Sequence, residues 1–208
     1  MFQPLNLDTW ARRDHFHFFR RFEEPFFGVT VEVDCTQAYA FSKDNGYSFF
    51  LYYLWQTLRA ANATEPFRYR ISGEEVRCYD EVHASPTINR PDGTFGFAYM
   101  NWHADFTVFL QEAQAEATRV RAATGLVPAI SGENVLHCSS MPWLRFSGLS
   151  HARAFSFPDS CPKIAYGKMT ESGGRRTMPL SVHVHHALMD GYDVGRFVEY
   201  FEEGMRAG

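Results

Sequence analysis

The chain has 208 residues, with 20 Lys and Arg against 24 Asp and Glu, and its formal net charge is −4 at neutral pH. No stripe of basic residues runs along it, which argues against a surface for nucleic acid or anionic membranes. Hydrophobic residues make up 45% of the chain and no Pro/Gly/Ser-rich linker divides it, so we expect one domain, residues 1–208. Its 20 phenylalanines suit either sheet–helix packing or a buried subunit interface.

The longest aromatic run, residues 49–55, is far shorter than the roughly 18 to 20 residues that cross a bilayer. The first residues lack the basic stretch and apolar core of a signal peptide. We therefore expect a cytoplasmic protein without membrane contact. Its four cysteines form no Cys-x-x-Cys pair and should be reduced core residues. They are Cys35, Cys78, Cys138 and Cys161.

The first half of the chain predicts short helices around one strand. Asp8 is a suitable N-cap for a helix with an inward face. That face would carry Arg12, His15, Phe16 and Phe19. Alternating valines at 29–33 predict a half-buried strand, and Asp34 then caps a helix that ends near Gly46.

Ser48 should cap a longer helix that reaches about Ala63. Residues 67–71 and 75–79 then predict a hairpin, and residues 105–124 form the clearest amphipathic helix, stopped by Gly125. The rest alternates strands with turns before a final helix, residues 192–203. This order indicates an α+β fold, a two-layer sandwich in which a mixed, mainly antiparallel sheet carries helices on one face.

The most informative segment, residues 182–197, reads VHVHHALMDGYDVGRF. A strand-like alternation delivers His186 to a strand end, and Asp190 follows four residues later, before Gly191. The short pattern His-x-x-x-Asp-Gly leaves two interpretations open. Asp190 is either simply the N-cap of the final helix or part of a catalytic site.

The longer string resembles the active-site segment of the chloramphenicol acetyltransferase family, CoA-dependent acyltransferases that also include the catalytic domains of dihydrolipoyl transacylases. Residues 10–20 resemble the family's Trp-x-Arg-x-x-His-Phe segment, and residues 139–146 resemble its Ser-x-x-Pro-Trp segment. The stretch between them, including residues 65–71, follows the family more loosely. The resemblance spans nearly the whole chain.

This resemblance implies an acetyl-CoA-dependent O-acetyltransferase whose leading acceptor is chloramphenicol, an activity that inactivates the antibiotic. His186 would be the general base, with its second ring nitrogen oriented by a backbone carbonyl. Asp190 would pair with Arg12 to hold the histidine loop, and the Ser139 hydroxyl would stabilise the oxyanion. Acetyl-CoA would be a co-substrate, and we expect no metal and no permanently bound cofactor.

The resemblance also implies a compact homotrimer with active sites between subunits, in which the motif histidine enters from one subunit and much of the acceptor pocket comes from the next. The residues expected to bind substrate are Phe19, Thr87, Phe95, His151 and Arg153.

Several positions depart from the family pattern. Phe19 stands where many relatives have tyrosine, Ala165 where a threonine is common, and Asp193 where a histidine is usual. His151 and Arg153 share strand parity within residues 149–155, where relatives that acetylate chloramphenicol well have apolar side chains. Because of these two polar side chains, the identity of the acceptor stays open.

Other interpretations remain. His183 and His185 lie two apart on a strand and could ligate zinc if a third ligand came from elsewhere, but packing of His185 beside the base and of His183 inside the sheet or interface is the favoured explanation. The chain could also be a noncatalytic trimeric binding protein, or a CoA acyltransferase for another small alcohol or thiol. A lipoyl acceptor is disfavoured because the sequence shows no lipoyl domain or linker.

Overall fold

The structure is a computed structural model that describes residues 1–126 and 132–207. The helices are α1 (Arg13–Phe19), α2 (Thr36–Asp44), α3 (Phe49–Ala63), the 3-10 helix η1 (Glu65–Arg68), α4 (Phe106–Ala122) and α5 (Gly191–Arg206). The strands are β1 (Phe2–Pro4), β2 (Phe26–Asp34), β3 (Tyr69–Ser72), β4 (Glu75–Tyr79), β5 (His83–Asn89), β6 (Phe95–Phe97), β7 (Val135–Ser140), β8 (Lys163–Tyr166), β9 (Thr170–Ser172) and β10 (Arg175–His185).

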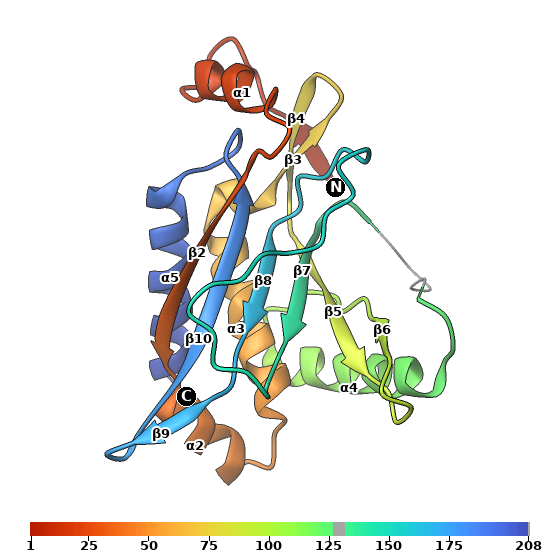
Figure 1. The fold of residues 1–208 in the computed structure, drawn as a ribbon, viewed down its shortest axis with the longest axis vertical. Helices are drawn as coiled ribbons and strands as arrows, with labels where there is room; N and C mark the ends of the chain where they lie inside the picture. The colour runs from red at the N-terminus through yellow and green to blue at the C-terminus, as the bar shows by residue number, and fades with distance from the viewer. Residues whose placement is uncertain (127–131, 208) are drawn as a thin grey trace.

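The main sheet has seven strands in the order β2-β10-β8-β7-β5-β6, with β9 paired to β10 outside this path. The pairs β5–β7 and β7–β8 are parallel, and the other pairs in this sheet are antiparallel. A separate three-stranded sheet, β1-β4-β3, lies near α1 (Figure 1). The predicted α+β sandwich with a mixed, mainly antiparallel sheet is confirmed.

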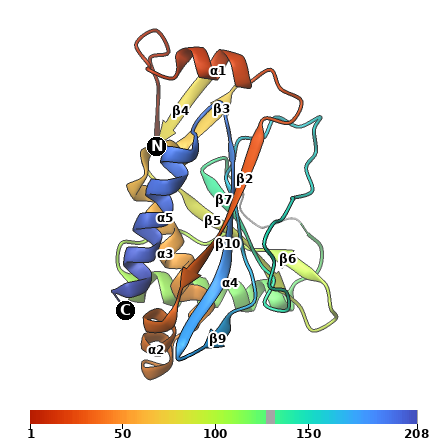
Figure 2. The same ribbon diagram turned by 60° about the vertical axis from the view of Figure 1, so that its left-hand side comes forward.

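Helices α2, α3 and α5 lie on one side of the main sheet (Figure 2). Leu54 and Leu58 of α3 and Phe197 and Phe201 of α5 are fully buried between the helices and the sheet. The other face is crossed by the segment Met141–Pro162, drawn in teal in Figure 2. The hydrophobic core therefore lies between the sheet and the helices. We call Met141–Pro162, which lies over the opposite face of the sheet, the covering segment.

The expected strand across residues 149–155 is wrong, because Met141–Pro162 contains neither strand nor helix. Pro142, Pro158 and Pro162 each lack an amide donor, and Gly148 adds backbone freedom, so the segment is poorly suited to extend a ladder. His151 and Arg153 therefore do not share a strand face, and their directions follow from side-chain contacts.

Helix boundaries follow local capping closely. Ser48 accepts a hydrogen bond from the Leu51 amide, and Asp105 accepts from the amides of Thr107 and Val108. After α4, Gly125 has a φ of +81°, a conformation that suits glycine. These helix ends confirm the predictions.

The predicted N-cap of the first helix is wrong. Helix α1 begins at Arg13, and Arg12 is its N-cap without a side-chain capping bond. Residues 6–10 form a turn instead, in which the Asp8 amide donates to the Asn6 side chain. Phe16 is buried as expected, but His15 is exposed.

Among the residues that the structure describes, no helix is both long and apolar enough to span a membrane.

Candidate active site

The His186 loop follows directly from the end of β10. The His186 amide donates to the Pro25 carbonyl at 2.8 Å, which extends the pairing of β10 with the β2 side by one residue. The ring turns back on its own loop, with Nδ1 3.2 Å from the carbonyl oxygen of Met189. With the proton on Nδ1 donated to this oxygen, Nε2 keeps its lone pair. The predicted backbone carbonyl is thus present.

Arg12 fastens this loop from α1. Its Nη1 lies 2.6 Å from Oδ2 of Asp190, and its Nη2 donates to the His186 carbonyl at 2.9 Å. Partial burial raises the pKa of Asp190, but the hydrogen bonds from Arg12 and the Tyr192 amide outweigh it and lower the pKa. The predicted pair is confirmed as a contact. It is partly buried, since 16% of the Arg12 side chain and 42% of the Asp190 side chain are exposed to solvent.

Asp190 is also the N-cap of α5, as the first interpretation of the motif aspartate predicts. Its side chain accepts from the Tyr192 amide, while Asp193 accepts from the Asp190 amide at 3.0 Å, which completes a capping box. Burial raises the pKa of Asp193. The departure at 193 is therefore explained by helix capping.

Two aromatic rings enclose the His186 imidazole. Phe19 of α1 stacks on it with ring centroids 3.9 Å apart and an interplanar angle of 21°, and Phe27 of β2 lies at 4.7 Å. These contacts fix the plane of the ring between α1 and β2. Phe19 was expected near the site, but Phe27 was missed, although the doublet Phe26-Phe27 opens the strand predicted from residues 29–33.

A cavity of about 450 Å³ contains four of the other predicted residues. They are Thr87 of β5, Phe95 of β6, Ser139 of β7 and His151 of the covering segment. It is also lined by Ser85, Phe97, His137, Cys138, Ala152, Asp159 and Lys163. We call it the first cavity. The sequence did not point to its charged residues, Asp159 and Lys163, because they approach the cavity through the irregular segment and β8.

Arg153, by contrast, does not line the first cavity. Its guanidinium lies 3.8 Å from the centroid of the Phe26 ring and forms an ion pair with Glu24, and its side chain is only 10% exposed. The His151 ring meets His183 edge-on at 4.7 Å, and burial lowers the pKa of His151 to about 4. The two side chains share a smaller cavity of about 200 Å³ near Glu24 and His183, but only His151 also lines the first cavity.

A second cavity of about 550 Å³ lies, like the first cavity, at the carboxyl end of β7, and the two cavities share Thr87. Ser140 lines it next to Ser139, whose side chain lines the first cavity. Arg121 and Lys168 are its cations. Its other lining residues are mainly apolar and include Phe49, Phe50, Tyr53, Pro142, Met169 and Met178. Sequence reasoning missed this cavity because its lining comes from six separate parts of the chain.

His186 and Ser139 lie far apart within one chain. Ser181 pairs with Ala165, which in turn pairs with Ser139, so two strand spacings separate β10 from β7. His186 is a further five residues along β10, and the two Cα atoms are therefore roughly 15–20 Å apart. Figure 1 shows β10 running up toward α1 and β7 running down toward the opposite end of the sheet.

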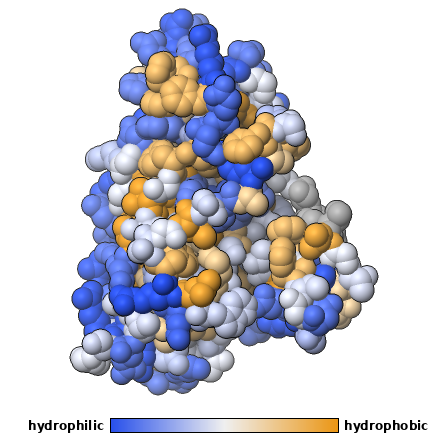
Figure 3. Space-filling model, in the orientation of Figure 1, coloured by the Kyte–Doolittle hydropathy of each residue, from blue (hydrophilic) through white to orange (hydrophobic). Residues whose placement is uncertain are grey.

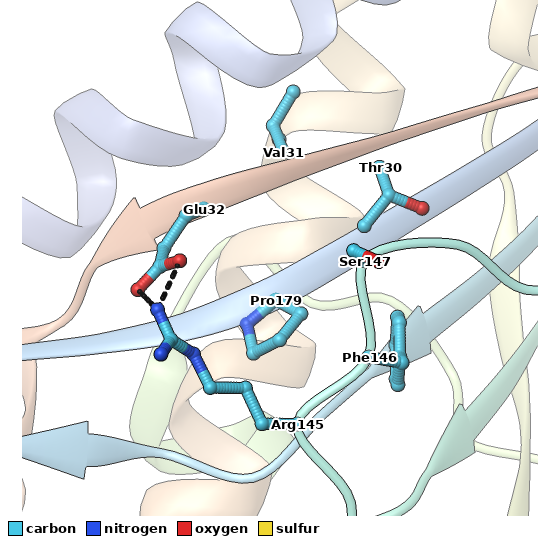
Figure 4. Close-up of a pocket in the computed structure, with 7 residues that line it drawn as sticks. All are labelled: Thr30, Val31, Glu32, Arg145, Phe146, Ser147 and Pro179. Atoms are coloured by element: carbon cyan, nitrogen blue, oxygen red, sulfur yellow. Dashed lines mark hydrogen bonds and ion pairs between the residues drawn. The ribbon is translucent and has the colours of Figure 1, made fainter.

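Another cavity lies on the outer face near the start of the covering segment (Figure 4). There Arg145 donates to both carboxylate oxygens of Glu32, at 2.9 and 2.8 Å, while Phe146 and Ser147 lie near Pro179. A hydrogen bond from Thr177 and the Arg145 contact lower the pKa of Glu32. This cavity contains no residue predicted for the site, and its ion pair anchors the covering segment.

The paired histidines on β10 have protein partners. Nδ1 of His183 lies 3.3 Å from the Ser181 hydroxyl, and Nδ1 of the buried His185 accepts from the Ala187 amide at 3.2 Å. Burial lowers the pKa of His185 to about 4. Within residues 1–126 and 132–207, the cluster of potential metal ligands is a different one, formed by His137, Asp159 and Cys161.

Comparisons with known proteins agree with this geometry. The family model for chloramphenicol acetyltransferase matches residues 1–202. Chloramphenicol acetyltransferase 3 of Escherichia coli is 28% identical over 205 residues, covering 97% of this chain and 96% of the relative. The chloramphenicol acetyltransferase of Streptomyces acrimycini is 31% identical over 196 residues, covering 93% and 89%. A solved structure of a chloramphenicol acetyltransferase superposes with a TM-score of 0.86 at 30% identity, covering 99% of this chain and all of that one. The family-model match, the similarity in sequence and the superposition together show that this chain belongs to the chloramphenicol acetyltransferase family.

Proposed function

We propose that this protein transfers the acetyl group of acetyl-CoA to a hydroxyl of chloramphenicol, with His186 as general base. The observation that carries the proposal is the loop that Arg12 holds, in a chain that the family model matches over residues 1–202. An imidazole with one nitrogen committed to a carbonyl presents the other as a base of suitable strength near neutral pH.

In the reaction, Nε2 of His186 takes the hydroxyl proton as the acceptor oxygen attacks the thioester carbonyl. The tetrahedral oxyanion then collapses, the carbon–sulfur bond breaks, and the proton on His186 passes to the CoA thiolate. Asp190 is not a relay partner, because its oxygens accept from Arg12 and from the first turn of α5. The stacked Phe19 ring keeps the imidazole plane fixed.

Ser139 is the proposed oxyanion donor. Its side chain lines the first cavity at the end of β7, and within the described residues it makes no hydrogen bond, so its hydroxyl is available. One well-aimed oxyanion donor is typically worth about 10²–10³ in rate, or roughly 2.7–4 kcal/mol.

The second cavity suits acetyl-CoA. Its apolar walls fit the pantetheine arm, and Arg121 and Lys168 supply positive charge for phosphates. Thr87 lines both cavities, and Ser139 and Ser140 lie side by side between them. The thioester would therefore arrive beside Ser139 from one side and the acceptor from the other. Because acetyl-CoA is a cytoplasmic metabolite, the proposed reaction belongs in the cytoplasm.

The separation of His186 from Ser139 requires two copies of the chain at each site. We therefore propose a homotrimer in which His186 of one subunit faces the first cavity of the next. Large apolar side chains of the covering segment are exposed in the single chain, including Trp143, Leu144, Phe155 and Phe157. Figure 3 shows hydrophobic patches on the face that carries this segment. Burial of such patches between subunits would stabilise the assembly.

The proposal is tested by incubating the purified protein with acetyl-CoA and a panel of alcohols and amines that includes chloramphenicol. Free thiol release and product mass are followed together. We expect thiol release matched by acetylated chloramphenicol. Thioester hydrolysis without acetylated product for any acceptor would refute the transferase and favour a binding protein with a degenerate site.

One observation favours a second acceptor class, a small alcohol more polar than chloramphenicol. The first cavity contains the ion pair of Lys163 and Asp159, an unusual lining for an aromatic, uncharged ligand. The same acceptor panel separates the two classes by their kcat/KM values.

A further inference from the structure

The first cavity shares His137 and Asp159 with an adjoining cavity, and the ionisable groups around both are not used by the proposed chemistry. His137 projects from β7, Asp159 and Cys161 belong to the end of the covering segment, and Lys163 begins β8. One ligand atom each from His137, Asp159 and Cys161 lie within 4.8 Å of one another. Imidazole, carboxylate and thiol are three different ligand types converging on one point.

We propose that His137, Asp159 and Cys161 form a binding site for Zn²⁺ in an adjoining cavity of about 450 Å³, which all three line and which shares His137 and Asp159 with the first cavity. A mixed nitrogen, sulfur and oxygen set favours zinc over magnesium or calcium, which prefer oxygen alone. Three protein ligands with one open position are typical of accessible zinc sites. The open position would face the acceptor, and this last point rests on the proposed function.

The geometry needs only a small contraction. Ligand atoms around tetrahedral zinc are roughly 3.3–3.8 Å apart, as follows from metal–ligand distances of about 2.0–2.3 Å. The present spacing of up to 4.8 Å therefore has to close by about 1 Å. Asp159 and Cys161 belong to the segment without regular secondary structure, so this adjustment does not break a sheet ladder.

The His137 ring is ready to bind a cation. It is exposed to solvent and lines both adjoining cavities, so a cation can reach its ring nitrogens. Burial raises the pKa of Cys161, whose thiol contacts the Glu133 carbonyl at 3.3 Å. Zinc binding would replace this contact and release the thiol proton to solvent.

Two positive groups oppose the metal. Lys163 donates to an oxygen of Asp159 and to the Cys161 carbonyl at 3.2 Å, and the buried Arg70 lies nearby. Zinc has to displace the ammonium group, so its affinity should be weaker than that of a structural zinc site. Removing the Lys163 charge should therefore tighten zinc binding. If Asp159 were not a ligand, the same change would leave the zinc affinity as it is.

The binding test is titration of the full-length protein with Zn²⁺ by calorimetry and with Co²⁺ by absorption. We expect a thiolate-to-cobalt band, loss of affinity by roughly tenfold or more in Cys161→Ser and His137→Asn, and tighter binding in Lys163→Met. Cys35→Ser is the matched control, since Cys35 lies beside Arg176, at the opposite end of β10 from His183, the strand partner of Lys163, and it should bind as the unchanged protein does. Equal binding by Cys161→Ser and the unchanged protein, or no thiolate band, would overturn the site.

Kinetics test where the metal lies. Zn²⁺ should raise the KM for the acceptor several-fold and leave that for acetyl-CoA unchanged, and Cys161→Ser should abolish the effect. Zinc binding without any change in the acceptor KM would refute the cavity position. If the protein transfers no acetyl group to any acceptor, the proposed function fails while the titrations still decide the metal site.

Discussion

At the residue scale, His186 is held by three kinds of contact: a carbonyl at Nδ1, an arginine on its own carbonyl, and a stacked phenylalanine. These contacts orient the ring but do not form the hydrophobic core. Replacing the side chain should therefore remove proton transfer without unfolding the protein.

We predict that His186→Ala lowers kcat by about 10²–10⁴-fold, the usual worth of a general base, with little change in acetyl-CoA binding. Initial rates of thiol release and a calorimetric titration with CoA measure the two effects. His15→Ala, an exposed histidine on α1, serves as the control and should keep full activity. Turnover by His186→Ala equal to that of the unchanged protein would end the assignment.

The Arg12–Asp190 contact predicts coupled losses. Asp190 is 42% exposed, so breaking the pair should cost less than the roughly 3–5 kcal/mol of a fully buried pair, and we expect about 1–3 kcal/mol. Asp190→Asn and Arg12→Ala should each lower activity and thermal stability. The double variant should lose less than the sum of the two single variants, measured by denaturant unfolding. Strict additivity would mean that the pair contributes nothing as a unit.

At the element scale, sequence patterns predicted the helix ends and strands that depend on residues close together in the chain. Ser48, Asp105 and Gly125 mark helix ends because capping depends on neighbouring backbone groups, and β2 follows from its own alternation. The covering segment was beyond such reasoning, since its path depends on distant contacts such as Arg145 with Glu32 and Arg153 with Glu24. For the same reason, the motif residues were predictable and the cavity floor at Asp159 and Lys163 was not.

The corrected path of this segment separates the roles of His151 and Arg153. We predict that His151→Leu lowers the chloramphenicol KM several-fold and leaves the acetyl-CoA KM unchanged, because His151 lines the first cavity. Arg153→Val should chiefly lower the melting temperature, since it removes the contacts with Glu24 and Phe26. Steady-state kinetics and thermal melting of both variants check this, and an unchanged chloramphenicol KM in His151→Leu would contradict the alignment of the pocket.

At the scale of the whole molecule, enclosed histidines link stability to pH. Burial lowers the pKa of His151 and His185 to about 4 from an ordinary value of 6.5. Between these values the unfolded chain binds more protons than the folded one, so stability is complete above about pH 6.5 and falls toward pH 4. Melting temperatures across this range should therefore decline steeply. His185→Gln should flatten the slope and His15→Gln should not, whereas equal slopes in both would contradict the linkage.

Each active site should also need two subunits. Because His186 and Ser139 lie roughly 15–20 Å apart in one chain, their side chains can meet only across an interface. A protein with His186→Ala and one with Ser139→Ala should each be strongly impaired. When they are coexpressed and assemble into mixed trimers, some sites combine an intact His186 from one chain with an intact Ser139 from the other.

Random mixing in equal amounts places both intact residues at about one quarter of the sites, so activity should recover to about one quarter of the unchanged protein's value. Mixing the two purified proteins without subunit exchange is the control and should give no recovery. Analytical ultracentrifugation of the mixture checks that trimers form. Mixed trimers that stay as inactive as their parents would mean that both groups act within one chain, and the shared site would have to be abandoned.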